Sequence, residues 1–123
     1  MSLKAYHQAR SYSETPRAME YRLFSDATRD LVRAVESGLT GVALMPALHR
    51  NREIWGVFSV LCRDEGNALP PTLRASIVSL AIWVDRHTSA VVRGKEQAAD
   101  LIEVNRTIMA GLERQSELML SVG

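Results

Sequence analysis

The sequence predicts an all-α protein: a small bundle of four main helices preceded by a short N-terminal helix. Apolar residues recur at helical spacing in four long segments, and glycine and proline lie where those segments end. We find no alternating strand pattern of useful length and no Asn-Gly or Asp-Gly hairpin turn. With 123 residues, 46% of them hydrophobic, the chain has enough length and apolar content for one globular domain.

The first two expected helices are unequal. Residues 3–11 are short and polar, and should form a docked or fraying helix. The second helix starts at Thr15, a natural N-cap, with Pro16 in the first helical position, where its missing N–H costs nothing. It should end near Ser37, because Gly38 accepts the left-handed conformation of a helix C-terminus. Its apolar stripe comprises Met19, Leu23, Ala27, Leu31 and Val35, widened by Phe24 and Ala34.

The third helix should begin near Gly41 or Pro46 and run to about Arg63. Its sequence is apolar nearly all round from Ile54 to Cys62, which predicts a central and mostly buried position. Cys62 is the single cysteine, so we expect a small core residue and no intrachain disulfide. One face carries Leu48, Asn51, Trp55, Phe58 and Cys62, flanked by Ala47, Ile54, Val57 and Leu61.

The fourth and fifth helices follow short loops, which favour antiparallel neighbours. The fourth should run from Pro70 or Pro71 to Arg93, with Gly94 as its stop, and the fifth from about Gln97. Beyond Gly111 the fifth helix either extends or frays. The fourth stripe is Leu73, Ile77, Leu80, Val84, His87 and Val91, beside Val78, Ala81, Ile82 and Thr88. The fifth is Leu101, Asn105, Ile108 and Leu112, beside Ile102, Val104 and Met109.

The sequence predicts no enzyme, no metal site and no cofactor. Its three histidines fall on three different segments, and no HExxH, GxSxG, P-loop or GxGxxG occurs. His87 faces an apolar stripe, where a hydrogen-bonded structural histidine is expected. Asn51 and Asn105 also fall on apolar stripes. Because a buried asparagine costs stability unless it is paired, we expect each to form hydrogen bonds with a neighbouring helix.

The stretch "LHRNREIW", residues 48–55, gathers the polar side chains that remain as recognition candidates. On a helix Asn51 and Trp55 turn inward, whereas His49, Arg50 and Glu53 turn outward and Arg52 lies at the flank. The net charge of +1 provides no basic field for DNA. Two interpretations stay open: recognition of a protein partner, or RNA contact through residues 49–52 and Arg86.

Nothing in the sequence indicates secretion or membrane insertion. The N-terminus lacks the apolar region of a signal peptide, and no window approaches the ~18–20 apolar residues of a membrane span. We therefore expect a cytoplasmic protein without a membrane partner.

Three patterns together resemble the FlaF family of flagellar biosynthesis regulators: "NR.IW", "N.LP..LRA.I..LA.WV..HT..V..G" and "LIE.N..IM.GL". The similarity runs from about residue 13 to 112. We expect one helical domain over residues 1–123, in which residues 1–12 and 113–123, outside the similarity, are flexible or extend helices. The similarity implies a cytoplasmic protein that promotes flagellin synthesis and secretion. Its partners would be flagellin, bound in the manner of a chaperone, and/or FlbT, a regulator of flagellin messenger RNA.

A helical bundle can bind an amphipathic helix in an apolar groove, and methionine adapts to different partners on such surfaces. Met45, Met109 and Met119 are the candidates, although Met109 is better explained as a core residue. Self-association or disorder explains the apolar tail of residues 118–122 equally well, so an oligomer remains open. The expected partner-binding residues are His49, Arg50, Glu53, Arg86, Met45, Leu118 and Met119.

Overall fold

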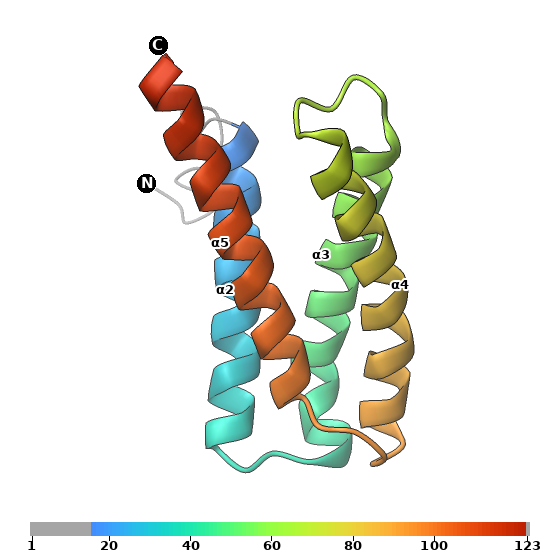
Figure 1. The fold of residues 1–123 in the computed structure, drawn as a ribbon. Coiled ribbons are helices and arrows are strands. Elements are labelled where there is room, and N and C mark those ends of the chain that lie inside the picture. Colours follow the sequence, from blue (N-terminus) through green and yellow to red (C-terminus); the bar gives the residue numbers. More distant parts are fainter. Residues whose placement is uncertain (1–15, 123) are drawn as a thin grey trace, which may run out of the picture.

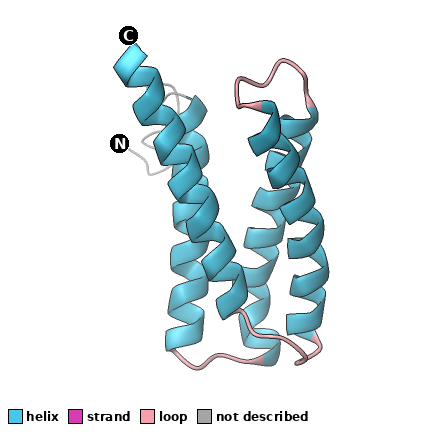
Figure 2. Ribbon diagram, viewed as in Figure 1, coloured by secondary structure: helices cyan, strands magenta, loops and turns pink. Residues whose placement is uncertain are grey.

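A computed structural model describes the backbone of residues 16–122 and the side chains of residues 17–115. Its elements are α2 (Pro16–Glu36), the 3-10 turn η1 (Gly41–Leu44), α3 (Met45–Arg63), α4 (Pro71–Val92) and α5 (Ala99–Val122). Figure 2 shows helices and loops alone over this part of the chain, which confirms the all-α fold. The short N-terminal helix expected at residues 3–11 lies outside the described residues.

The four helices form an antiparallel bundle of two pairs (Figure 1). α3 packs against α4 and α2, and α2 also packs against α5. The contact between α4 and α5 is the smallest of these interfaces. In Figure 1, α5 crosses α2 and runs away from α4 toward its C-terminal end.

The helix boundaries follow the expected chemistry. α2 begins at Pro16 and α4 at Pro71, and in both the proline takes a position that needs no N–H donor. α2 ends at Glu36, and the φ of 69° at the following Gly38 lets the Leu39 N–H return to the Ala34 carbonyl at 3.0 Å. α4 ends at Val92 in the same way, with Gly94 at φ 74°. α5 does not stop near Gly111 but continues as a helix to Val122.

The core lies where all four helices meet. Phe24 of α2 packs edge-on against Trp55 and Phe58 of α3, with ring centroids 5.2 Å apart in both pairs. Ile77 and Val84 of α4 close it on one side. From α3, all five residues of the predicted inward face are buried: Leu48, Asn51, Trp55, Phe58 and Cys62. From α5, Leu101, Asn105, Ile108 and Leu112 are buried as expected.

The prediction that α3 is mostly buried is wrong. The side chains of Val57 and Leu61 are 61% and 46% exposed, and Val60 is exposed as well. The cause is the number of neighbours: α2 and α4 flank α3, α5 lies across the core, and no described element covers the remaining side. Apolar sequence alone did not indicate that this side would stay open.

The predicted α2 stripe is correct in part. Phe24, Ala27, Leu31 and Ala34 are buried. Met19, Leu23 and Val35 are instead exposed. A step of four residues advances about 40° beyond a full turn, so a stripe with this spacing drifts around the helix. Its ends therefore leave the core side. On α4, Ile82 is exposed for a similar reason, since it lies off the Ile77–Val84 line.

Candidate functional site

A polar network lies at the centre of the bundle, on the residues where the sequence predicted paired asparagines. Asn51 of α3 and Asn105 of α5 are fully buried. The Asn105 Nδ2 donates to Asn51 Oδ1 at 2.7 Å and to Thr28 Oγ1 at 3.1 Å. The Trp55 Nε1–H donates to Asn105 Oδ1 at 2.8 Å. Asn105 thus joins α5 to both α2 and α3.

The donor-only indole of Trp55 fixes the orientation of both amides. Because Trp55 Nε1–H must face an oxygen, Asn105 presents Oδ1 to it and turns Nδ2 toward Asn51. Asn51 must then present Oδ1 in return, and its buried Nδ2 has no hydrogen-bond partner. Both polar groups of the Asn105 side chain therefore have partners, whereas the amide donor of Asn51 has none among the described residues.

The outward residues of "LHRNREIW" do not form one basic patch. His49 is exposed and lies 3.8 Å from Glu53, one turn along α3. Arg50 pairs with Asp30 of α2 at 2.8 Å. Arg52, expected only at the flank, instead ties α3 to α4: its Nε lies 3.2 Å from Asp85, and it donates to the Ser89 hydroxyl at 2.8 Å.

An apolar groove of about 540 Å³ runs between α2 and α3, over the side of α3 that no helix covers. Of the predicted recognition residues with described side chains, Glu53 alone lines it, and its side chain is exposed. Asn67 and the largely buried Glu20 also line it. The floor is formed by Phe24 and Phe58, which also belong to the core. The walls are aliphatic: Met19, Leu23, Ile54, Val57 and Leu61.

The groove holds an acidic residue with a raised pKa. Burial raises the pKa of the Glu20 carboxyl, against the opposing effect of Arg17, which pairs with it one turn earlier on α2. Burial also raises the pKa of the Cys62 thiol, and the negative charge of the nearby Glu20 raises it further. The thiol of Cys62 is therefore a buried, poorly reactive group, as its place in an apolar run suggested.

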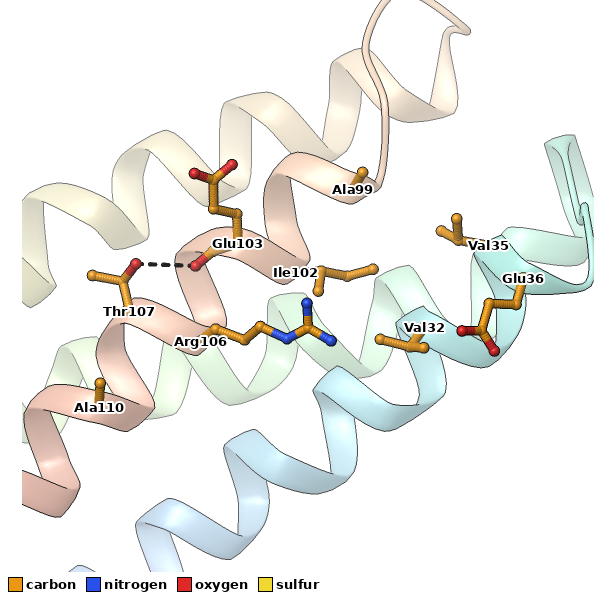
Figure 3. Close-up of a pocket in the computed structure, with 9 residues that line it drawn as sticks. All are labelled: Val32, Val35, Glu36, Ala99, Ile102, Glu103, Arg106, Thr107 and Ala110. Carbon is orange, nitrogen blue, oxygen red and sulfur yellow. Dashed lines mark hydrogen bonds between the residues drawn. The ribbon is translucent and has the colours of Figure 1, made fainter.

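A second hollow, of about 740 Å³, lies between α2 and α5 (Figure 3). Its apolar part is small: Val32 and Val35 face Ile102, and the Arg106 side chain extends from α5 toward Val32. Glu36, Glu103 and Thr107 complete a mixed lining. The Thr107 hydroxyl bonds to the Glu103 carbonyl of its own helix at 3.1 Å, so this hydroxyl is engaged within α5.

A third hollow, of about 510 Å³, lies between α3 and α4 and collects arginines. Arg52, Arg63 and Arg86 line it, together with Val60 of α3 and Ile82 of α4. Arg86 was among the recognition residues predicted from the sequence, whereas Arg63 was not. Because Arg52 is held by Asp85, the cationic part of this hollow rests on Arg63 and Arg86.

Comparison with protein families assigns the chain to a family. The sequence profile described as "Flagellar protein FlaF" matches residues 2–112. The chain belongs to the FlaF family. Comparison with curated proteins and with solved structures gave no match. The family assignment makes this a flagellar protein, and the matched residues include all three hollows and the central network.

The remaining predicted sites of this FlaF-family chain fall in different places. Met45 is exposed at the start of α3 but lines none of the three hollows. Met109 is half-buried against the core, and the Thr28 hydroxyl contacts its sulfur at 3.7 Å. The side chains of Leu118 and Met119 lie outside the described residues. Over residues 16–122, no helix is long and apolar enough to cross a membrane.

One cluster of potential metal ligands, His87, Glu96 and Asp100, was not predicted from the sequence. His87 was expected to be a hydrogen-bonded structural histidine, and its Nε2 does lie 3.1 Å from the Gln97 carbonyl. It also lies 3.1 Å from a carboxylate oxygen of Asp100, and Glu96 stands beside both. The spacing His-x8-Glu-x3-Asp across a helix, a tight turn and the next helix start was the available signal. To use this spacing, one would have had to predict that the chain reverses direction at Gly94 and brings Glu96 and Asp100 back to the last turns of α4.

Proposed function

We propose that this FlaF-family protein promotes flagellin synthesis and secretion by binding an amphipathic helix of flagellin in the groove between α2 and α3. It would act in the cytoplasm as a binding protein rather than an enzyme. The observation that carries the proposal is the groove itself, whose aliphatic walls stay exposed on a helix that is otherwise part of the core. A flagellar family and an open apolar groove together suit a chaperone-like role.

The chemistry of the groove specifies the occupant. Its walls would accept apolar side chains at helical spacing, and their burial would contribute about 25 cal/mol for each Å² removed from water. Met19 can adjust its shape to the anchor that it meets. The exposed Glu53 beside the groove favours a partner helix that carries lysine or arginine next to its apolar stripe.

Two valines on α3 provide a matched test. Val57 lines the groove and Val60 lines the hollow on the other side of α3, and they are 61% and 64% exposed. We expect Val57→Asp to weaken binding of purified flagellin at least tenfold by isothermal titration calorimetry. Val60→Asp should bind like the wild type. Equal binding by all three proteins would contradict the groove as the flagellin site.

FlbT is the second protein partner that the family resemblance suggested. The same pair of variants separates the two, because FlbT bound at the groove should lose affinity with Val57→Asp and compete with flagellin. If FlbT binding is unaffected by Val57→Asp and does not displace flagellin, the two partners use different faces.

RNA contact is a second candidate function, favoured by the arginines that line the hollow between α3 and α4. Phosphate contacts release counterions, so RNA binding through Arg63 and Arg86 should weaken steeply with salt, whereas apolar docking should not. We expect the double variant Arg63→Glu/Arg86→Glu to leave flagellin binding unchanged. If that variant no longer binds flagellin leader RNA while Val57→Asp still binds it, a role in RNA binding beside the groove would be supported. If both variants bind the RNA like the wild type, RNA contact through Arg63 and Arg86 would be ruled out.

A further inference from the structure

Three metal-ligating side chains meet where α4 turns into α5. His87 comes from the last turns of α4, Glu96 from the connecting loop and Asp100 from the first turn of α5. One ligand atom from each lies within 4.8 Å of the other two. The Gln97 carbonyl oxygen is a fourth donor, 3.1 Å from His87 Nε2.

The imidazole is held in place before any ion binds. The His87 side chain is 9% exposed, so its ring cannot swing freely. Its ring stacks on the indole of Trp83, with centroids 4.5 Å apart and planes 19° apart. This leaves Nε2 directed at the Asp100 carboxylate and the Gln97 carbonyl. The only other described histidine, His49, is an exposed residue with a single carboxylate beside it.

We propose that His87, Glu96 and Asp100, with the Gln97 carbonyl, form a binding site for a divalent transition metal of the Zn²⁺ class. One imidazole with carboxylate and carbonyl oxygens is a donor set that Zn²⁺ accepts, usually in a tetrahedron with bonds of about 2.0–2.2 Å. In such a tetrahedron neighbouring donor atoms lie ~3.3 Å apart, as follows from those bond lengths. The two distances of 3.1 Å from His87 Nε2 are close to this value.

Glu96 is the ligand that would have to move to complete the tetrahedron. Glu96 is exposed and lies in the loop, so rotation of its side chain can shorten its distances to the other ligands. The ion would bind His87 Nε2 and the Asp100 carboxylate and so join α4, the loop and α5. The contact between α4 and α5 is smaller than those of α2 with α3 and α5 and of α3 with α4, so a bridging ion would add a link where there are few.

The test uses the full chain and Zn²⁺ itself. We expect isothermal titration calorimetry to show one Zn²⁺ per chain, with affinity that falls as the solution is acidified, because binding displaces a proton. Mg²⁺ and Ca²⁺ should not compete, since both prefer sites made only of oxygen. Ni²⁺ or Cu²⁺ should quench tryptophan fluorescence in the wild type, and Trp83→Phe should remove most of this quenching while retaining Zn²⁺ affinity.

Variants decide which residues hold the ion. Asp100→Asn and His87→Gln should lower Zn²⁺ affinity at least tenfold, and the exposed Glu96→Gln should lower it without disturbing the fold. The matched controls are His49→Ala, from the other histidine–carboxylate pair, and His7→Ala, from outside the described residues. Unchanged affinity in Asp100→Asn and Glu96→Gln, loss of affinity in either control, or a wild-type dissociation constant in the millimolar range would overturn the proposal.

Discussion

From Ile54 to Cys62 both sides of α3 are apolar in sequence, but the structure buries one side and exposes the other. The inward side, from Leu48 to Cys62, is buried against three helices and carries the Asn51 and Trp55 side chains. The outward side exposes Val57 and Leu61 along the groove. The difference teaches that apolar character determines which surfaces need cover, whereas the number of neighbouring helices determines which of them receive it.

The two sides also differ in their polar content. The inward side contains a hydrogen-bonded network that joins α2, α3 and α5 through Asn105. The groove has no polar group on its floor, and its charges stand at the rim. Substitutions on the inward side should therefore act on folding, and substitutions on the outward side should act on binding.

Removal of the Trp55 side chain should have the largest effect on stability. Trp55→Ala deletes a buried side chain that packs on Phe24, and it leaves Asn105 Oδ1 without its donor. We expect the free energy of unfolding to fall by about 3–5 kcal/mol, measured by urea denaturation. A loss below about 1 kcal/mol would mean that the core does not depend on α3 as the structure indicates.

The two asparagines should respond unequally to substitution by leucine. Asn105→Leu removes the centre of the network, so the buried donor of Trp55 and the carbonyl of Asn51 lose their partner, which costs about 1–3 kcal/mol. Asn51→Leu also removes an amide donor that has no partner, so its loss should be smaller. Near-ultraviolet circular dichroism should change in both. Equal losses by urea denaturation would contradict the assigned amide orientations.

Much of the fold could be predicted from the sequence because its signals are local. Pro16, Pro71, Gly38 and Gly94 mark helix boundaries through backbone chemistry that needs no distant partner. The inward face of α3 could be predicted because its spacing keeps one set of residues on one side. The coverage of the outward face could not, since it depends on how many helices pack around α3.

The candidate sites were less predictable because they join segments distant in sequence. The groove combines Leu23 with Val57, and the proposed metal site combines His87 with Asp100. Arg52 is a further case: its sequence neighbours suggested an RNA or partner contact, but Asp85 of another helix holds it. Of the predicted recognition residues whose side chains the structure describes, only Glu53 reaches the groove, because it lies one turn before Val57.

Charge placed on the outward side should have little effect on folding. Val57→Asp changes an exposed side chain that forms no hydrogen bonds, so we expect a change in unfolding free energy within about 0.5 kcal/mol. The same substitution at Ile77, in the core, serves as the control and should unfold the protein. If Val57→Asp lowers stability by several kcal/mol, its side of α3 is covered in solution, by another copy or another part of the chain.

The smallest effect should come from Glu20, where the groove meets the core. Burial raises the pKa of this carboxyl in the folded state, so the folded protein holds the proton more tightly than the unfolded chain does. That contribution favours folding at acidic pH and is lost as the pH rises through the folded pKa, so charged Glu20 costs stability at neutral pH.

Glu20→Gln should therefore raise the midpoint of urea unfolding slightly at pH 7, and this gain should vanish in acid, where the wild-type carboxyl is protonated. Glu53→Gln, at the exposed rim of the same groove, is the control and should show little change. If Glu20→Gln instead lowers stability at pH 7, the ion pair with Arg17 outweighs burial. The Arg17–Glu20 ion pair on α2 would then be a structural contact that a bound partner must leave intact. Basic residues of that partner would have to pair with Glu53 instead.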